Sequence, residues 1–234
     1  MEKEYSEGTI PINITVVETS VANLYKSPSF KSELVTQAIF MEKLLILSQE
    51  KKWYKVKQWD GYESWIHSFY LYTHDEIDNF YSLEEEYCTD DLNIQYDFLK
   101  AYQQKFSPSN LINTAKSFLD IPYLWGGKSS LGFDCSGFVQ TVFKALNIAL
   151  PRDSSQQIKH RDLIEINYSE IEVGDLLFFS ENKTINHVAI CIGNEEIIHS
   201  SGCVKIEKLK ENKELYQKLY KVMSTRSLNE SVYE

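Results

Sequence analysis

The sequence has no long hydrophobic run and no excess of positive charge. No segment approaches the roughly 20 apolar residues that a helix needs to cross a bilayer. Residues 1–30 also lack the basic start and apolar core of a secretory signal. The formal net charge is −10, which argues against nucleic acid or an anionic membrane as a partner. We therefore expect a cytoplasmic, globular protein that binds neither.

Closely paired cysteines are absent too. The four cysteines are Cys88, Cys135, Cys191 and Cys203, and none forms a Cys-x-x-Cys motif or another metal-ligand spacing. We expect all but Cys135 to be reduced and structural. Cys191 and Cys203 lie in apolar, strand-like segments, where buried and inert thiols are common.

Residues 12–72 have the pattern of a small β-barrel. Short β segments alternate with turn residues, and no helical period is sustained over four turns. The dipeptide Asp60-Gly61 is a strong hairpin signal. Strand candidates are 14–17, 44–47, 53–57 and 62–66. We place this domain at residues 1–73.

An acidic, tyrosine-rich stretch follows at residues 74–108. It has no glycine, and no proline before Pro108, so we expect a partly helical connector rather than a flexible linker. Its charges are typical of a solvated face.

Residues 109–234 have an α+β pattern, with helices first and an antiparallel sheet after them. Ser109 and Asn110 are candidate caps of a first helix, and Leu111 and Ala115 follow at helical spacing. A second helix starts at Cys135, with apolar positions 138, 139, 142, 143 and 146 on one face, and stops before residue 151, a proline. Strand candidates are 175–179, 187–192, 197–200 and 204–208.

Cys135 has the setting of an activated nucleophile. It follows Asp134, a candidate N-cap, and therefore lies in the first turn of its helix. Unpaired backbone N–H groups and the helix dipole favour the thiolate there, and the thiolate is the nucleophilic form of cysteine. The same N–H groups can stabilise an oxyanion on a carbonyl that the sulfur attacks.

His187 is the best candidate for the base. It begins an alternating strand, and His199 follows after a turn at Gly193-Asn194, so a hairpin brings the two side chains together. His199 can then hold the His187 imidazole in one tautomer. The same residues make a poor zinc site because no further ligand lies close in sequence, so we expect no metal and no cofactor.

These residues lie in motifs that resemble those of the NlpC-type papain-like cell-wall cysteine peptidases. The similarity covers about residues 109–226. The motifs are, in order, Tyr123-Leu124-Trp125-Gly126-Gly127, Asp134-Cys135-Ser136-Gly137-Phe138-Val139-Gln140, Leu150-Pro151-Arg152-Asp153-Ser154-Ser155-Gln156-Gln157, Gly174-Asp175-Leu176-Leu177-Phe178-Phe179 and His187-Val188-Ala189-Ile190. The resemblance implies a papain-like α+β catalytic domain behind an SH3-like β-barrel.

The resemblance also implies roles for single residues. Cys135 would be the nucleophile, His187 the general base and acid, and His199 the polar third member of the triad. Tyr123 is similar to the tyrosine whose hydroxyl helps the oxyanion hole. The alternative for Tyr123 is a purely structural role, aromatic packing at the start of the helix.

The whole chain is similar to one subgroup, the γ-D-glutamyl-L-diamino acid endopeptidases, in which the barrel restricts the substrate to peptides with a free N-terminal L-alanine. By motif, Asp134 would meet the alanine ammonium, and Ser136 and Ser154 the D-glutamate carboxylate. Tyr62 resembles the tyrosine of the barrel beside that ammonium, although Ser64 stands where the family often has glycine. Glu63 would add negative charge next to Tyr62.

The resulting hypothesis is a cysteine endopeptidase that hydrolyses L-Ala-γ-D-Glu-diamino acid muropeptides through a thioester, in the recycling of wall fragments. The diamino acid is diaminopimelate or lysine. Two alternatives stay open: a non-catalytic module that binds wall peptides, and an amidase or acyltransferase on the same fold. Structural roles also stay open for Ser154 as a helix cap and for Tyr62 as a surface residue of the barrel.

Overall fold

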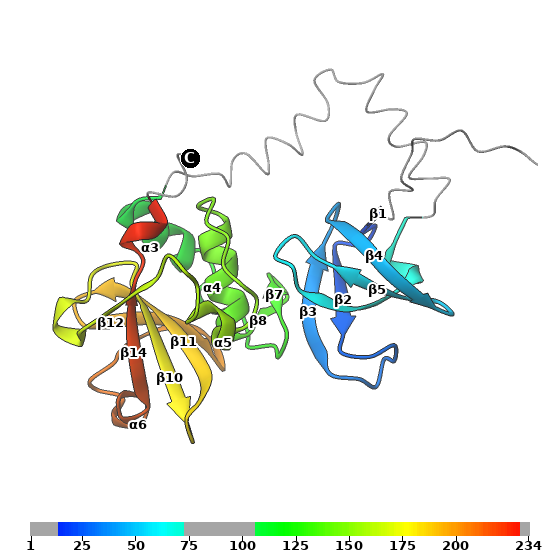
Figure 1. The fold of residues 1–234 in the computed structure, drawn as a ribbon. Helices are drawn as coiled ribbons and strands as arrows, with labels where there is room; N and C mark the ends of the chain where they lie inside the picture. Colours follow the sequence, from blue (N-terminus) through cyan, green and yellow to red (C-terminus); the bar gives the residue numbers. More distant parts are fainter. Residues whose placement is uncertain (1–13, 73–105, 230–234) are drawn as a thin grey trace, which may run out of the picture.

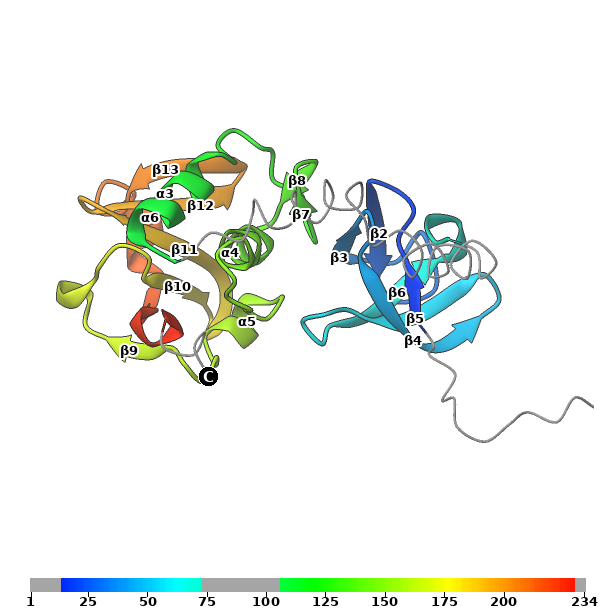
Figure 2. The same cartoon turned by 90° about the horizontal axis from the view of Figure 1, so that it is seen from above.

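The computed structural model describes residues 14–72 and 106–229, which form a β-barrel and an α+β domain side by side (Figure 1). The view from above shows the same arrangement, with strands β7 and β8 of the second domain on the side of the barrel (Figure 2). The connector at residues 74–108 lies almost wholly outside the described residues, as does Cys88. Among the helices of the described ranges, none has the length and apolar character needed to cross a membrane.

The barrel is a six-stranded antiparallel sheet that closes around a small core. Its elements are β1 (Ile14–Val16), β2 (Val21–Tyr25), β3 (Leu34–Ile39), β4 (Lys43–Glu50), β5 (Trp53–Lys57), β6 (Glu63–His67) and η1 (Ser68–Tyr70). The strand order is β1-β4-β5-β6-β2-β3. The core consists of Val17, Ala22, Leu24, Ala38, Leu44, Val56, Ile66 and Leu71. The expected hairpin is present between β5 and β6, and Gly61 takes the left-handed conformation that its turn requires.

The second domain has a second six-stranded antiparallel sheet, in the order β13-β12-β11-β10-β14-β9. Its elements are α3 (Pro108–Lys116), β7 (Lys128–Ser129), β8 (Gly132–Phe133), α4 (Cys135–Lys144), α5 (Ser154–Gln157), β9 (Ile164–Ile166), η2 (Tyr168–Glu170), β10 (Leu176–Glu181), β11 (Thr184–Gly193), β12 (Glu196–Ser201), β13 (Cys203–Lys208), α6 (Lys213–Gln217), β14 (Leu219–Ser224) and η3 (Arg226–Asn229). The α+β prediction is confirmed.

Helix α4 is the central element of this domain. Phe138 and Val142 are fully buried and belong to one core cluster with Val188 and Ile190 of β11. Burying a side chain of this size stabilises the fold by roughly 1.5–3 kcal/mol. The packing therefore holds the first residue of α4 against β11.

Strand β11 alternates as its sequence predicts. Val188, Ile190 and Ile192 pack on the side of α4, whereas Ala189 and Cys191 join a second cluster on the other face of the sheet. The hairpin between β11 and β12 is present as well, with Ile190 opposite Ile198.

The candidate caps of two helices are replaced by neighbouring residues. Helix α3 begins earlier than predicted, because the Ser107 hydroxyl accepts a hydrogen bond from the Asn110 N–H at 3.1 Å and Pro108 occupies the first helical position. Proline suits that position, since its missing N–H would have no partner there. Ser154 is the first residue of α5 rather than its cap, which is Asp153.

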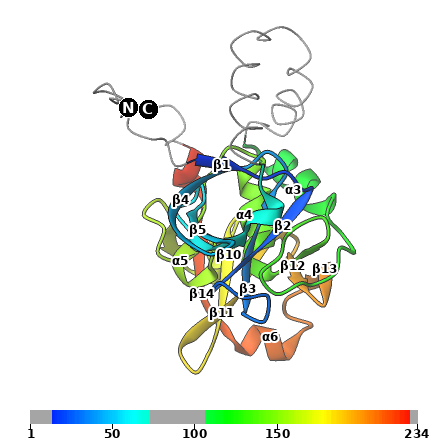
Figure 3. The same ribbon diagram turned by 90° about the vertical axis from the view of Figure 1, so that its right-hand side faces the viewer.

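Buried polar side chains join the two domains. The Gln37 carbonyl oxygen on β3 accepts hydrogen bonds from the Lys128 N–H at 3.0 Å and from the Ser129 hydroxyl at 2.8 Å. Its amide nitrogen donates to Asn23 at 3.0 Å. Viewed from the barrel side, the barrel lies in front of α4 (Figure 3). These bonds therefore fix the barrel over the N-terminal part of the second domain.

At Gly126 the backbone of the second domain runs close to strand β3 of the barrel. A Cβ atom added to Gly126 would lie 2.5 Å from the backbone oxygen of Leu34 on β3, and its φ is +75°. Only glycine fits there without a shift of the barrel.

Candidate active site

Cys135 is the first residue of α4 and is buried against β11. Its Sγ lies 3.9 Å from the Asn186 carbonyl oxygen, and the N–H groups of Val188 and Ser136 point at the sulfur. Asn186 and Val188 flank His187 in the chain. The thiol therefore meets the β11 backbone on both sides of His187.

A chain of three side chains continues from His187 across adjacent strands. His187 Nε2 lies 2.7 Å from His199 Nδ1 on β12, and His199 Nε2 lies 2.7 Å from a carboxylate oxygen of Glu207 on β13. Lys205 stands opposite His199 in the ladder, and Glu207 follows two residues along the same face. Lys205 Nζ also contacts Glu207, at 3.2 Å. We call His187, His199 and Glu207 the relay.

Burial sets the charge state of the nucleophile and the base. It raises the pKa of the Cys135 thiol to about 11, with a smaller contribution from the Asp134 carboxylate. Burial, and then His199, lower the pKa of His187 to about 3. The first-turn N–H groups favour the thiolate as expected, but desolvation outweighs them. Both groups are therefore neutral at neutral pH, and the thiol must lose its proton during attack.

The Asp134 carboxylate is the hub of a buried cluster next to Cys135. Its oxygens accept hydrogen bonds from the N–H groups of Gly137, at 2.6 Å, and Gly126, at 2.9 Å. Both oxygens also accept from the Arg152 guanidinium, at 3.0 and 2.5 Å. Arg152 further donates to the Ser136 hydroxyl at 3.0 Å. The guanidinium is thus neutralised and fixed by Asp134.

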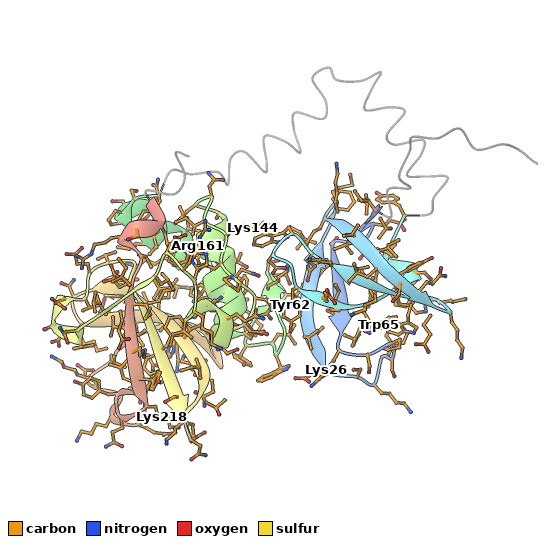
Figure 4. All side chains as sticks on the ribbon, viewed as in Figure 1. Lys26, Tyr62, Trp65, Lys144, Arg161 and Lys218 are labelled. Atoms are coloured by element: carbon orange, nitrogen blue, oxygen red, sulfur yellow. The ribbon has the colours of Figure 1, made fainter. Side chains whose placement is uncertain are left out.

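The barrel reaches this cluster directly. Arg152 Nε donates to the Thr36 hydroxyl on β3 at 3.2 Å. The Tyr62 hydroxyl is hydrogen-bonded to Asp153, and burial followed by Asp153 raises its pKa to about 12. Figure 4 shows Tyr62 on the side of the barrel that faces the second domain. The barrel therefore supplies one wall of the site.

Two aromatic residues complete the surroundings. Burial, and then Cys135 and Asp134, raise the pKa of Tyr123 to about 12, so its hydroxyl keeps its proton beside the nucleophile. The Trp125 indole N–H donates to the Glu33 carboxylate of the barrel at 3.1 Å. Glu33 also contributes to the electrostatic field at Tyr62. Two further carboxylates, Asp153 and Glu33, therefore act on Tyr62 at the wall that the barrel supplies.

Comparison with known proteins agrees with this arrangement. Residues 120–225 match the NlpC/P60 family, and residues 24–69 match the bacterial dipeptidyl-peptidase SH3 domain. The chain carries an NlpC/P60 domain.

Two relatives are similar in sequence to this chain. One is the gamma-D-glutamyl-L-lysine dipeptidyl-peptidase of Bacillus cereus, 31% identical over 188 residues that cover 79% of this chain and 49% of the relative. The protein of the same name from Bacillus subtilis is 40% identical over 128 residues, 53% of this chain and 43% of the relative. The chain thus spans about half the length of these relatives. An NlpC/P60 family protein of known structure from Bacillus cereus has 27% identity and a TM-score of 0.48, covering 90% of this chain and 63% of the other.

Most of the site residues predicted from the sequence lie together in the NlpC/P60 domain, whereas Ser154 lies on another helix. Cys135, His187, His199, Tyr123, Asp134 and Ser136 gather at the start of α4 and its facing strands. Ser154 is buried at the start of α5, which packs near β11. Their roles stay predictions. The hydroxyl of Ser136 is already engaged, since it donates to Asp134 at 3.3 Å and accepts from Arg152.

The charge expected from Glu63 comes from another residue. Glu63 pairs with Lys55 at 2.7 Å on the barrel surface, because successive residues of an extended strand point to opposite faces. Glu33 is the barrel glutamate whose charge acts on Tyr62, while its carboxylate contacts Lys26 and Trp125. Sequence reasoning also missed Glu207, Arg152 and Asp153, although the last two lie inside a quoted motif. In the described ranges, no three His, Cys, Asp or Glu side chains gather closely enough to hold a metal ion.

Proposed function

We propose that this protein is a cysteine peptidase that hydrolyses the γ-D-glutamyl-L-diamino acid bond of small peptidoglycan peptides. The observation that carries the proposal is the relay beside a buried cysteine at a helix N-terminus, with His187 and His199 joined at 2.7 Å. The names of the relatives from Bacillus cereus and Bacillus subtilis support the same bond type.

The proposed reaction starts with a neutral thiol and a neutral imidazole. Cys135 Sγ attacks the γ-carbonyl carbon of D-glutamate while its proton moves to His187. The first-turn N–H groups and the protonated Tyr123 hydroxyl stabilise the resulting oxyanion. The imidazolium then protonates the leaving amine of the diamino acid, which gives a thioester. Water activated by His187 releases the dipeptide L-Ala-γ-D-Glu and regenerates the thiol.

The wall formed by Tyr62, Asp153 and Glu33, called the acidic wall below, fits an ammonium group. Arg152 is neutralised by its bidentate contact with Asp134, and Glu33 pairs with Lys26 at 3.0 Å on the exposed side, so Asp153 leaves net negative charge near Tyr62 and the Glu33 carboxylate adds to the field there. A free N-terminal amine of the substrate would satisfy these groups, whereas an amide nitrogen would not. We therefore assign the ammonium of L-alanine to Tyr62, Asp153 and Glu33, with Asp134 as the group that orients Arg152.

Hydrolysis of synthetic tripeptides tests the activity. L-Ala-γ-D-Glu-L-Lys and its diaminopimelate counterpart are incubated with the protein, and the dipeptide is quantified by mass spectrometry. We expect release by the native protein and by C191A, which removes a buried thiol on the far face of the sheet, but not by C135A. Undiminished release by C135A, or none by the native protein, would reject the proposal, and binding without release would favour the wall-peptide-binding alternative.

A second comparison tests the ammonium site. N-acetylation of the tripeptide removes the positive charge, and we expect kcat/KM to fall at least about 30-fold, equivalent to ~2 kcal/mol. D153N and E33Q should lower kcat/KM for the free peptide but not for the acetylated one, with E50Q as an exposed barrel control. Equal cleavage of both peptides would refute the assignment. The cytoplasmic location and the recycling role stay predictions, which cell fractionation can test.

A further inference from the structure

Glu207 ends the relay and has no role in the reaction proposed above. Its carboxylate can only accept hydrogen bonds, so the 2.7 Å contact requires a proton on His199 Nε2. A neutral His199 then has a bare Nδ1, which must accept the hydrogen bond from His187 Nε2. His187 in turn carries its proton on Nε2 and keeps a lone pair on Nδ1. One carboxylate thus determines the proton position on two imidazoles.

We propose that Glu207 is a positioning residue that fixes the tautomers of His199 and His187, and so makes His187 Nδ1 the atom that takes the Cys135 proton. This inference rests on the proposed function. In the step concerned, the S–H bond breaks and the N–H bond forms at Nδ1, while the sulfur lone pair forms the S–C bond. The carbonyl π electrons move to the oxygen.

Without the carboxylate, the contact between the two imidazoles does not specify their tautomers. A protonated Nδ1 on neutral His199 could bind only an unprotonated His187 Nε2, which moves the His187 proton to Nδ1. That tautomer cannot accept a proton from the thiol at Nδ1. The carboxylate therefore excludes the unproductive arrangement rather than contacting the substrate.

The charge of Glu207 acts in the same direction. Glu207 raises the pKa of His187 and of His199, whereas Lys205, its partner at 3.2 Å, lowers both. On the α4 side, the charged or titratable neighbours of Cys135 are Asp134, Arg152 and Tyr123. Glu207 is thus the anion that strengthens the base, and Lys205 moderates it.

Three variants test the proposal. E207Q keeps an acceptor oxygen but loses the charge, and we expect kcat to fall about 10-fold with KM changed less than about twofold. E207L removes the acceptor, and kcat should fall about 100-fold, by analogy with the loss of carboxylates that orient metal-bound imidazoles. E165Q is the matched control, since Glu165 is an exposed strand glutamate paired with Lys221 far from the relay. K205M removes a nearby cation and should raise the pKa of His187, whereas E207Q should lower it.

The tautomers themselves provide a readout that does not depend on substrate. In ¹⁵N-histidine NMR spectra of the native protein at pH 7, His187 and His199 should both carry the proton on Nε2. E207Q should keep this pattern, and E207L should lose it at His199. Unchanged tautomers in E207L, or a kcat within twofold of the native value, would overturn the proposal. If the native protein shows the tautomers but cleaves neither tripeptide, the proposed function fails while the role of Glu207 stands.

Discussion

Substituting Gly126 with alanine should separate the effect of domain docking from that of backbone strain. Gly202 provides the matched control, because it has nearly the same φ, +77° against +75°, but no atom within 4 Å of an added Cβ. A left-handed conformation costs a non-glycine residue about 1–2 kcal/mol, which both variants share. Only at Gly126 does the new methyl group meet the backbone of Leu34, at 2.5 Å from its oxygen.

That contact sets the magnitude of the difference. An ordinary contact distance requires the barrel strand to move by several tenths of an ångström, and overpacking of this kind costs about 1–3 kcal/mol. G126A should therefore lower the free energy of unfolding by about 1–3 kcal/mol more than G202A does. The displaced barrel should also misplace Tyr62 relative to Asp153, so we expect kcat/KM for the free tripeptide to fall about 10- to 100-fold.

The assays are urea denaturation followed by tryptophan fluorescence, and tripeptide hydrolysis at low substrate concentration. The rate at which iodoacetamide alkylates Cys135, quantified on the isolated peptide, reports on the nucleophile independently of substrate binding at the barrel. This rate should differ less than threefold between G126A and the native protein. If G126A and G202A unfold with free energies within about 0.5 kcal/mol of each other, the close approach to Leu34 does not determine how the domains dock.

Three further predictions follow from buried polar groups. R152M should lower the free energy of unfolding by about 3–5 kcal/mol in urea denaturation, because Asp134 loses its buried cation. The double variant R152M/D134N should regain part of this loss. A fall below about 1 kcal/mol in R152M would contradict the reasoning. Q37L leaves two buried donors unpaired, at about 1–3 kcal/mol each, and should make the domain junction more sensitive to limited proteolysis than in the native protein. Because burial lowers the folded pKa of His187 to about 3, the unfolded chain binds a proton near pH 6.5 that the folded chain does not. Stability should therefore fall as the pH drops from about 6.5 towards 3, and H187Q should show a smaller fall in urea denaturation at pH 7, 5 and 4, whereas equal falls would refute the assignment.

Local patterns in the sequence predicted the parts of the fold that depend on near neighbours. The start of α4 at Cys135 follows from its Asp134 cap and from the apolar spacing behind it. The faces of β11 follow from simple alternation, and the turn at residues 193–194 brings His187 to His199. These features need only the period of one element and one tight turn. Strands β2, β3, β9 and β14 were not predicted, although β2 alternates between half-buried and buried residues.

Groups that meet through long-range packing could not be predicted in this way. Glu207 lies in a Lys-rich segment that resembles a solvated edge strand, and only the pairing of β13 with β12 brings it to His199. Glu33 meets Trp125 across 92 residues of sequence. The raised pKa of Cys135 also depends on burial by the sheet, which no local pattern reveals, whereas the favourable helix terminus is visible in the motif.

The hydrogen bonds of Gln37 have a consequence for how such proteins can diversify. Its amide oxygen joins the barrel to two residues of β7, and its amide nitrogen binds Asn23 within the barrel, so both ends of the amide are committed. A barrel without Gln37 would lack this joint, and the wall that it supplies would lose its place beside the nucleophile. New substrate preferences should therefore arise by single changes at rim positions such as Glu33, and rarely by exchange of whole domains.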